Sequence, residues 1–161
     1  MPEPHEPRTI GRYQVLRFIG RGGMGEVFLA LDPDLQRQVA IKILPAASHD
    51  DEKLKARLIS EARTVAALNH PSIVTIHEVG VTDSRDEGLP SGVPYLVMEY
   101  LQGEPLDRLL AQRRLSSTEC VSIAIQVAQG LGFAHQNRMI HRDIKPSNLI
   151  LASDGRVKIL D

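Results

Sequence analysis

Residues 19–27, IGRGGMGEV, decide how the surrounding chain is expected to fold. The glycines stand at positions 20, 22, 23 and 25. Such a loop either joins a strand to a helix, as in dinucleotide-binding units, or forms the turn between two strands. The residues that follow, VFLA at 27–30, have the composition of a strand. The stretch therefore predicts a β-hairpin and an antiparallel sheet.

Strand-like runs continue on both sides of this hairpin. Residues 13–20, 26–32 and 37–44 are short, rich in β-branched or aromatic residues, and bounded by Gly, Asp or Pro. Residues 50–71 have helical periodicity, with Asp50 or Asp51 as the cap. Two more strands are expected in residues 72–81 and 93–101, separated by a polar loop. After a flexible arm of residues 1–12, residues 13–98 are thus predicted to form a five-stranded antiparallel lobe with one helix.

The second half of the chain has a different pattern. After a linker at residues 99–104, helices are expected within 105–114 and 116–138. Ser116 and Glu119 match the S-x-x-E capping box at the start of the second helix. A loop at 139–148 is followed by two short strands joined through Asp154-Gly155, a strong turn signal. Residues 105–161 are therefore a partial helical lobe, and the fold class is α+β.

Composition excludes several classes of partner. The 161 residues are 42% hydrophobic and 24% charged, with a formal net charge of −1. No basic patch stands out, so neither a nucleic acid nor an anionic membrane is an expected partner. Cys120 is the only cysteine, which excludes an intrachain disulfide and fits a reducing compartment. The most apolar stretch, residues 120–134, is too short to span a bilayer. We expect a cytoplasmic chain without a membrane segment.

Two features of the first half suggest binding of an anionic ligand. A glycine-rich hairpin can lay backbone N–H groups over a polyphosphate, although a flexible hairpin that binds nothing is the alternative. Lys42 alternates onto the same strand face as Ala40, where an ammonium needs an anionic partner. Glu61, beside the apolar stripe of the predicted helix, is the natural candidate. Considered singly, Lys42 is better explained as a surface lysine and Glu61 as a solvated helix charge.

The most specific signal is HRDIKPSN at residues 141–148. It follows GRGGMGEV at 20–27, VAIK at 39–42, EAR at 61–63, NHPSIV at 69–74 and YLVMEYLQG at 95–103. In this order and spacing the chain resembles the bacterial eukaryotic-like (Hanks-type) serine/threonine protein kinases from residue 13 to its last residue. The resemblance implies a protein-kinase-like fold, with a sheet-based N-lobe and a truncated helical C-lobe that ends at the Asp of the Asp-Phe-Gly motif.

The resemblance assigns roles in phosphoryl transfer, where positioning and charge neutralisation dominate catalysis. Asp143 would accept the proton of the substrate hydroxyl, and Lys145 would lie beside the γ-phosphate. Asn148 and Asp161 would ligate Mg²⁺ through oxygen atoms. His141 is expected to be a packing histidine, and Arg142 resembles the arginine that pairs with an activation-loop phosphate.

The resemblance also assigns the ATP site. Met98 would be the gatekeeper, with Glu99 and Leu101 as hinge residues and Lys42 and Glu61 as the ion pair. The remaining nucleotide-binding residues would be Ile19, Gly20, Arg21, Gly22, Gly23, Met24, Gly25, Glu26, Val27, Ala40 and Ile150.

The implied function is an ATP- and Mg²⁺-dependent serine/threonine protein kinase, whose partners are Mg-ATP and proteins with Ser or Thr hydroxyls. A catalytically inactive nucleotide-binding or interaction fragment is the alternative. A small-molecule kinase is disfavoured by Lys145 within KPSN. No Phe-Gly follows Asp161, so we expect a truncated kinase domain. Its long helix would expose Val121, Ile125, Ala128 and Leu131 unless a partner or the missing part of the C-lobe covers them.

Overall fold

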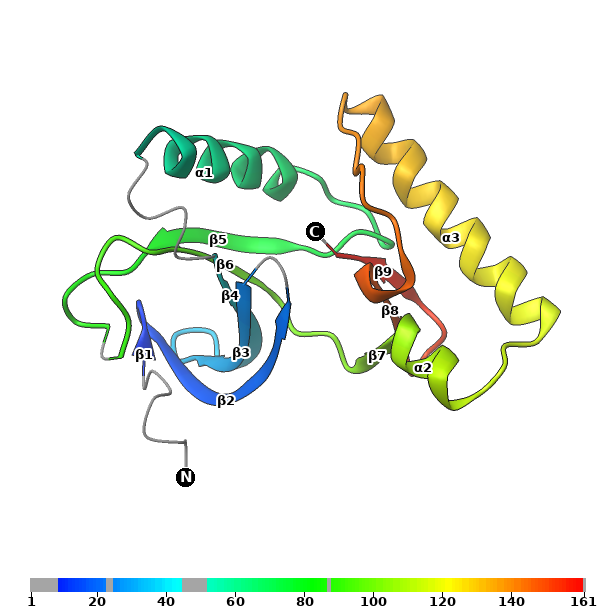
Figure 1. The fold of residues 1–161 in the computed structure, drawn as a ribbon, viewed down its shortest axis with the longest axis horizontal. Coiled ribbons are helices and arrows are strands. Elements are labelled where there is room, and N and C mark those ends of the chain that lie inside the picture. Colours follow the sequence, from blue (N-terminus) through cyan, green and yellow to red (C-terminus); the bar gives the residue numbers. More distant parts are fainter. Residues whose placement is uncertain (1–8, 23–24, 45–51, 87, 161) are drawn as a thin grey trace. The chain divides into compact units, whose positions relative to one another are not determined.

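The computed structural model describes residues 9–22, 25–44, 52–86 and 88–160 (Figure 1). The chain divides into two compact units. The first contains Met1–Ala67 and Ile76–Tyr100, and the second contains Leu68–Thr75 and Leu101–Asp161. The change of unit after Tyr100 falls inside the linker that the sequence predicts at residues 99–104.

The first unit is built on one antiparallel sheet with the strand order β1-β2-β3-β4-β6-β5. The five expected strands are confirmed, and a short strand at the N-terminal side extends the sheet. The bounds are β1 Thr9–Ile10, β2 Tyr13–Gly22, β3 Gly25–Asp32, β4 Arg37–Ile43, β5 Ile76–Val81 and β6 Pro94–Glu99. Helix α1, Glu52–Ala66, contacts β5 and β6 (Figure 1). The expected caps, Asp50 and Asp51, lie outside the described residues.

The folded sheet begins at residue 9, within the stretch of residues 1–12 that the sequence predicts as a flexible arm. Ile10 is fully buried, and the Gly11 N–H donates to Asp86 Oδ1 at 2.6 Å. The Arg12 guanidinium lies 3.3 Å from Glu78 Oε2. These contacts join residues far apart in sequence, so local composition did not reveal them. Residues 1–8 of the arm lie outside the described part of the chain.

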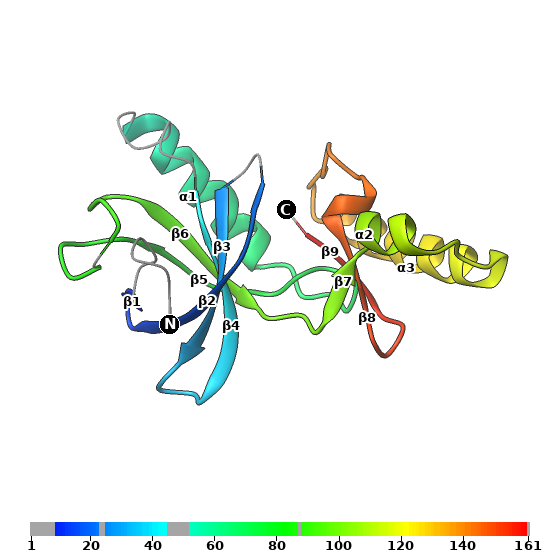
Figure 2. The ribbon, with the colours of Figure 1, turned by 60° about the horizontal axis from the view of Figure 1, so that its bottom comes forward.

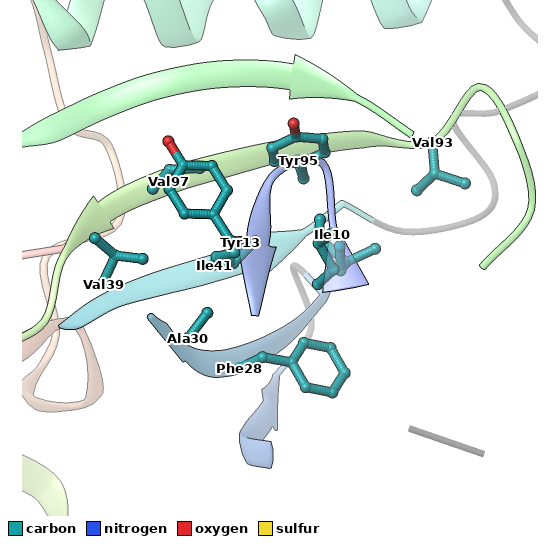
Figure 3. Packing of buried hydrophobic residues seen from close by; sticks show 10 residues of the cluster. Ile10, Tyr13, Phe28, Ala30, Val39, Ile41, Val93, Tyr95 and Val97 are labelled. Carbon is teal, nitrogen blue, oxygen red and sulfur yellow. The ribbon is translucent and has the colours of Figure 1, made fainter. Parts of the chain in front are cut away.

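The core of the first unit lies on one face of this sheet. Val39 and Ile41 alternate along β4 and are fully buried, as are Val93 and Val97 near β6 (Figure 3). Burial of such a side chain contributes roughly 1.5–3 kcal/mol. Because side chains alternate along a strand, Ala40 and Lys42 lie on the other face of β4. Packing of Val39 and Ile41 in the core therefore fixes the strand from which Lys42 extends.

The second unit combines helices with a three-stranded sheet of order β7-β8-β9 (Figure 2). Its elements are β7 Gly103–Pro105, α2 Leu106–Gln112, α3 Ser117–Gln136, the 3-10 helix η2 Pro146–Asn148, β8 Leu149–Ala152 and β9 Val157–Ile159. The predicted capping box is confirmed. The Glu119 N–H donates to Ser116 Oγ at 3.2 Å, and the Ser116 N–H donates to Glu119 Oε2 at 2.8 Å.

The segment Leu68–Thr75 belongs to the second unit, although the sequence analysis places it in the first lobe. The Ile159 N–H donates to Ser72 O at 2.9 Å, and the Val74 N–H donates to Ile159 O at 3.0 Å. Lys158 Nζ also donates to Ile73 O at 3.3 Å. The segment therefore lies along the outer edge of β9, a long-range pairing that a linear pattern does not reveal.

Helix α3 presents apolar side chains on its outer face. Val121 is 58% exposed and Ile125 is 52% exposed, as the sequence analysis expects. Leu131, expected on the same face, instead packs against the buried cluster of Ile123, Leu149 and Val157. Among the described residues, no helix has the length and apolar character that crossing a membrane requires.

Candidate active site

The glycine stretch forms a hairpin, as its sequence predicts. Gly22 pairs with Gly25, and Gly20 pairs with Val27 across β2 and β3. Gly23 and Met24 lie outside the described residues. Gly25 has φ +122°, and a Cβ atom there would overlap the carbonyl oxygen of Ile43. Only glycine fits this position without strain, so the hairpin approaches β4 more closely than other residues would allow.

Charged side chains flank the hairpin near its turn. Arg21 and Glu26 face each other across the two strands and form an ion pair. The Arg21 side chain is 74% exposed. Such exposed pairs contribute little to stability, and both charges remain accessible to a ligand.

Ala40 and Met98, the predicted base-contacting residue and gatekeeper, lie opposite each other on β4 and β6. They are 7% and 9% exposed. Val27 on β3 lies opposite Lys42, which is two positions after Ala40 on β4. Ile19 on β2 is half-buried, and Glu99 is the last residue of β6. The first unit therefore gathers these predicted adenine-site residues on neighbouring strands.

Lys42 lies near the end of β4 between β3 and β6 and is only 6% exposed. Transfer of an ammonium group from water to such a position is costly without compensating interactions. The strand pairing on both sides fixes the backbone from which the side chain extends. Lys42 thus has the burial expected of a lysine that holds an anionic group.

Glu61 is carried by α1 and interacts with a residue of its own helix. Arg57 Nε donates to Glu61 Oε1 at 2.8 Å, an i,i+4 pair in which the Glu61 side chain is 59% exposed. This partner was not expected from the sequence, although the spacing is the one at which helical side chains meet. The pairing of Glu61 with Lys42 stays a prediction.

The second unit brings Asp143, Lys145 and Asn148 together in the loop before β8. Lys145 Nζ donates to Asp143 Oδ2 at 2.7 Å, and Asn148 Nδ2 donates to the same oxygen at 3.1 Å. The hydrogen bond from Lys145, followed by its charge and the Asn148 amide, lowers the pKa of Asp143 below the ordinary Asp value. Asp143 is therefore an ionised, half-exposed carboxylate at neutral pH.

The geometry of Asn148 suits its predicted role as a metal ligand. Nδ2 also donates to Asp143 O at 2.8 Å, and the residue is 9% exposed. Both hydrogen bonds to Asp143 use the amide nitrogen, which leaves the amide oxygen as the atom suited to a hard cation such as Mg²⁺. Asp161, the second predicted ligand, lies outside the described residues.

His141 has a polar role in addition to the predicted packing role. Its Nδ1 accepts from the Asp143 N–H at 3.3 Å, and its Nε2 lies 2.7 Å from Leu160 O. In the tautomer that carries its proton on Nε2, the ring donates to Leu160 O and accepts at Nδ1. His141 thereby connects the backbone of Asp143 to the residue that precedes Asp161. Arg142, between them, has φ +66°, which is uncommon for a non-glycine residue.

Ile150 and Leu101 complete the predicted residues of the second unit. Ile150 on β8 lies opposite Pro105 on one side and Lys158 on the other, and it is half-buried. Leu101 is the first residue after the change of unit and is also half-buried.

Gln126, whose side chain binds the β8–β9 turn, is not among the residues predicted from the sequence. The available signal was a glutamine on the otherwise apolar side of the α3 pattern.

Comparison with known proteins agrees with this geometry. Residues 13–161 match the protein kinase domain family. The chain is 42% identical over 153 residues to the probable serine/threonine-protein kinase PknB of Bifidobacterium longum, covering 94% of this chain and 22% of that protein. It is 41% identical over 152 residues to the serine/threonine-protein kinase PknA of Mycobacterium tuberculosis, covering 94% of this chain and 35% of that protein.

Solved structures give the same result. The crystal structure of the Mycobacterium tuberculosis PknI kinase domain superposes with a TM-score of 0.78 at 31% identity, over 95% of this chain and 59% of that one. The chain thus spans about a fifth to a third of the length of these curated relatives and over half of a solved kinase domain. With the family match over residues 13–161 and the paired Asp143, Lys145 and Asn148, the chain belongs to the protein kinase domain family.

Proposed function

We propose that this chain is the N-terminal part of a serine/threonine protein kinase domain that transfers the γ-phosphate of ATP to protein Ser or Thr hydroxyls. The observation that carries the proposal is the Asp143 carboxylate, held ionised by Lys145 and oriented by Asn148. Relatives 40–42% identical are named serine/threonine-protein kinases, and the family uses ATP and Mg²⁺ in general.

In this proposal Asp143 accepts the proton of the substrate hydroxyl as the oxygen attacks the γ-phosphate. A carboxylate with a lowered pKa remains available as a hydrogen-bond acceptor for that hydroxyl throughout the physiological range. Lys145 bonds to one oxygen of Asp143, and its charge would also offset the charge of the transferred phosphoryl group. Asp143 thus contributes mainly by orienting the nucleophile.

Asn148 and Asp161 are the residues that would hold Mg²⁺, which supplies charge neutralisation on the phosphate oxygens when bound. The amide nitrogen of Asn148 is bound to Asp143, so its oxygen is the predicted ligand. In the first unit, Lys42 would bind phosphate oxygens and the glycine hairpin would cover the polyphosphate. Ala40 and Met98 would contact the adenine.

The test is Asp143→Asn in the protein that carries this domain, with radiolabelled ATP and a protein substrate rich in Ser and Thr. Asparagine keeps the size of the side chain but cannot remain a carboxylate acceptor, so we expect transfer to be abolished while nucleotide binding is retained. Asp107→Asn, at an exposed position in α2, is the matched control and should retain transfer.

Unchanged transfer by Asp143→Asn would refute the proposed role of Asp143. Nucleotide binding without any transfer by the unsubstituted protein would instead favour the alternative, a non-catalytic nucleotide-binding module.

A further inference from the structure

Gln126 is a polar residue on the core-facing side of α3. Ile123 and Gly130, three positions before and four positions after it, are both buried. These spacings place the three residues on one face of the helix. Gln126 itself is half-buried, so its amide can reach the backbone of a neighbouring element.

The amide of Gln126 binds the hairpin between β8 and β9 at two points. Its Oε1 accepts from the Val157 N–H at 2.9 Å, and its Nε2 donates to Gly155 O at 3.0 Å. A longer contact, 3.4 Å, joins Nε2 to Ser122 Oγ on the same helix. The two hairpin partners flank Arg156, so one planar amide holds the last turn residue and the first residue of β9.

The bond from Val157 to Gln126 lies on the outer edge of β9, the edge that does not face β8. Its inner edge pairs with β8, where Leu151 lies opposite Val157. On the outer edge, the Ile159 N–H donates to Ser72 O, and the Val157 N–H donates to Gln126. Val157 is 1% exposed, so removal of the glutamine amide would leave its N–H group without this partner in a buried position.

The hairpin that Gln126 binds also contacts Asn148, one of the two predicted metal ligands, at its open end. Leu149 lies opposite Ile159, and the Leu160 N–H donates to Asn148 O at 2.8 Å. Asn148 directly precedes β8, and Asp161 follows β9 by two positions in the sequence. Turn geometry fixes the register of a hairpin, and Gln126 binds Gly155 in the turn and Val157 at the start of β9.

We propose that Gln126 is a positioning residue of the phosphotransfer site, which stabilises the register of the β8–β9 hairpin and thereby the placement of Asn148 relative to the end of β9. The role in Mg²⁺ binding rests on the proposed function, whereas the hold on the hairpin does not. Gln126 acts through the backbone of Gly155 and Val157 and is not itself a catalytic residue.

Three variants test the proposal. Gln126→Met keeps the length and apolar stem but lacks the amide, and Gln126→Glu keeps an acceptor for Val157 but loses the donor to Gly155. Gln129→Met makes the same change at an exposed position of the same helix and is the control. If Gln126→Met fails to fold, Gln126→Glu still tests whether the amide stabilises the hairpin.

The first measurement is hydrogen exchange at the Val157 amide without nucleotide. Loss of one buried hydrogen bond predicts exchange faster by a factor of about ten in Gln126→Met, with a smaller increase in Gln126→Glu and none in Gln129→Met. Exchange at the parent rate in both Gln126 variants would overturn the proposal.

The second measurement is the Mg²⁺ dependence of ATP binding. We expect the Mg²⁺ concentration needed for half-maximal effect to rise about three- to tenfold in Gln126→Met, with metal-free ATP affinity unchanged. A general loss of stability would lower both affinities together, and that result, or an unmoved Mg²⁺ dependence, would overturn the positioning role. Absence of Mg²⁺-dependent ATP binding in the parent protein would refute the proposed function and, with it, the role of Gln126 in Mg²⁺ binding. The exchange measurement would still show whether Gln126 stabilises the β8–β9 hairpin.

Discussion

Replacement of Gly25 by alanine should damage the glycine hairpin through backbone geometry alone. Gly25 has φ +122°, a region that is nearly exclusive to glycine. A Cβ atom there would overlap Ile43 O and lie 3.0 Å from Ile43 C and 3.5 Å from Leu44 Cα. All three atoms belong to the backbone, so no side-chain rotation relieves the contact, and the strands β3 and β4 must separate locally.

The size of the effect follows from this strain. A non-glycine residue in such a backbone conformation costs on the order of 1–3 kcal/mol, before the overlap with Ile43 is counted. For a chain of this size each kcal/mol lowers Tm by about 2–4 °C, so Gly25→Ala should lower Tm by about 2–12 °C. Lys42 lies opposite Val27, next to the pair of Glu26 and Ile43, where the added Cβ would force the strands apart. Nucleotide affinity should therefore fall as well.

Gly20→Ala is the matched control in the same hairpin. Among the described residues, no heavy atom lies within 4 Å of a Cβ atom at this position, and Gly20 is not in the left-handed region. Its effect on stability should stay within about 0.5 kcal/mol. Thermal unfolding followed by calorimetry, with binding of a fluorescent ATP analogue, measures both variants. Equal Tm values for Gly20→Ala and Gly25→Ala would refute the argument from backbone strain.

Two further predictions concern the charged residues of the site. Arg57→Ala removes an exposed i,i+4 pair worth about 0.3–0.5 kcal/mol. If Glu61 then pairs with Lys42, titration should show Mg-ATP affinity raised about twofold, and reduced affinity would contradict this competition. Lys145→Met removes the main cause of the lowered pKa of Asp143. The ionised carboxylate is lost as the pH falls through that pKa, so its midpoint in a carbon NMR titration should move up toward the ordinary Asp value of about 3.9. A midpoint that stays in place or moves down would show that Lys145 does not stabilise the carboxylate.

Local features of the fold were predictable because short sequence spacings set their hydrogen bonds. The capping box joins Ser116 to Glu119, and the turn before β9 contains Gly155 with φ +82°. The glycine hairpin likewise follows from the strand-like residues on both sides of the loop. In each case the interacting residues lie within a few positions of each other in the sequence. The local sequence pattern is therefore enough to predict the contact.

Contacts between distant residues were not predictable in the same way. Ile73 binds Lys158 across 85 positions, and this pairing moves Leu68–Thr75 into the second unit. Gln126 reaches Val157 across 31 positions. Gln126 and Gln129 stand in the same helix pattern, and the sequence does not show that Gln126 faces the β8–β9 hairpin.

By itself, the sequence determined the class of the fold and the identity of the candidate catalytic residues. The resemblance of residues 141–148 to a kinase catalytic loop nominated Asp143, Lys145 and Asn148, which all lie on one short loop. Only the tertiary structure decided what surrounds them. The bond of His141 to Leu160, the pairing of Glu61 with Arg57 and the hold of Gln126 on the hairpin depend on how packed elements orient their side chains. Packing sets those orientations through long-range contacts and local rotamers, neither of which a linear pattern records.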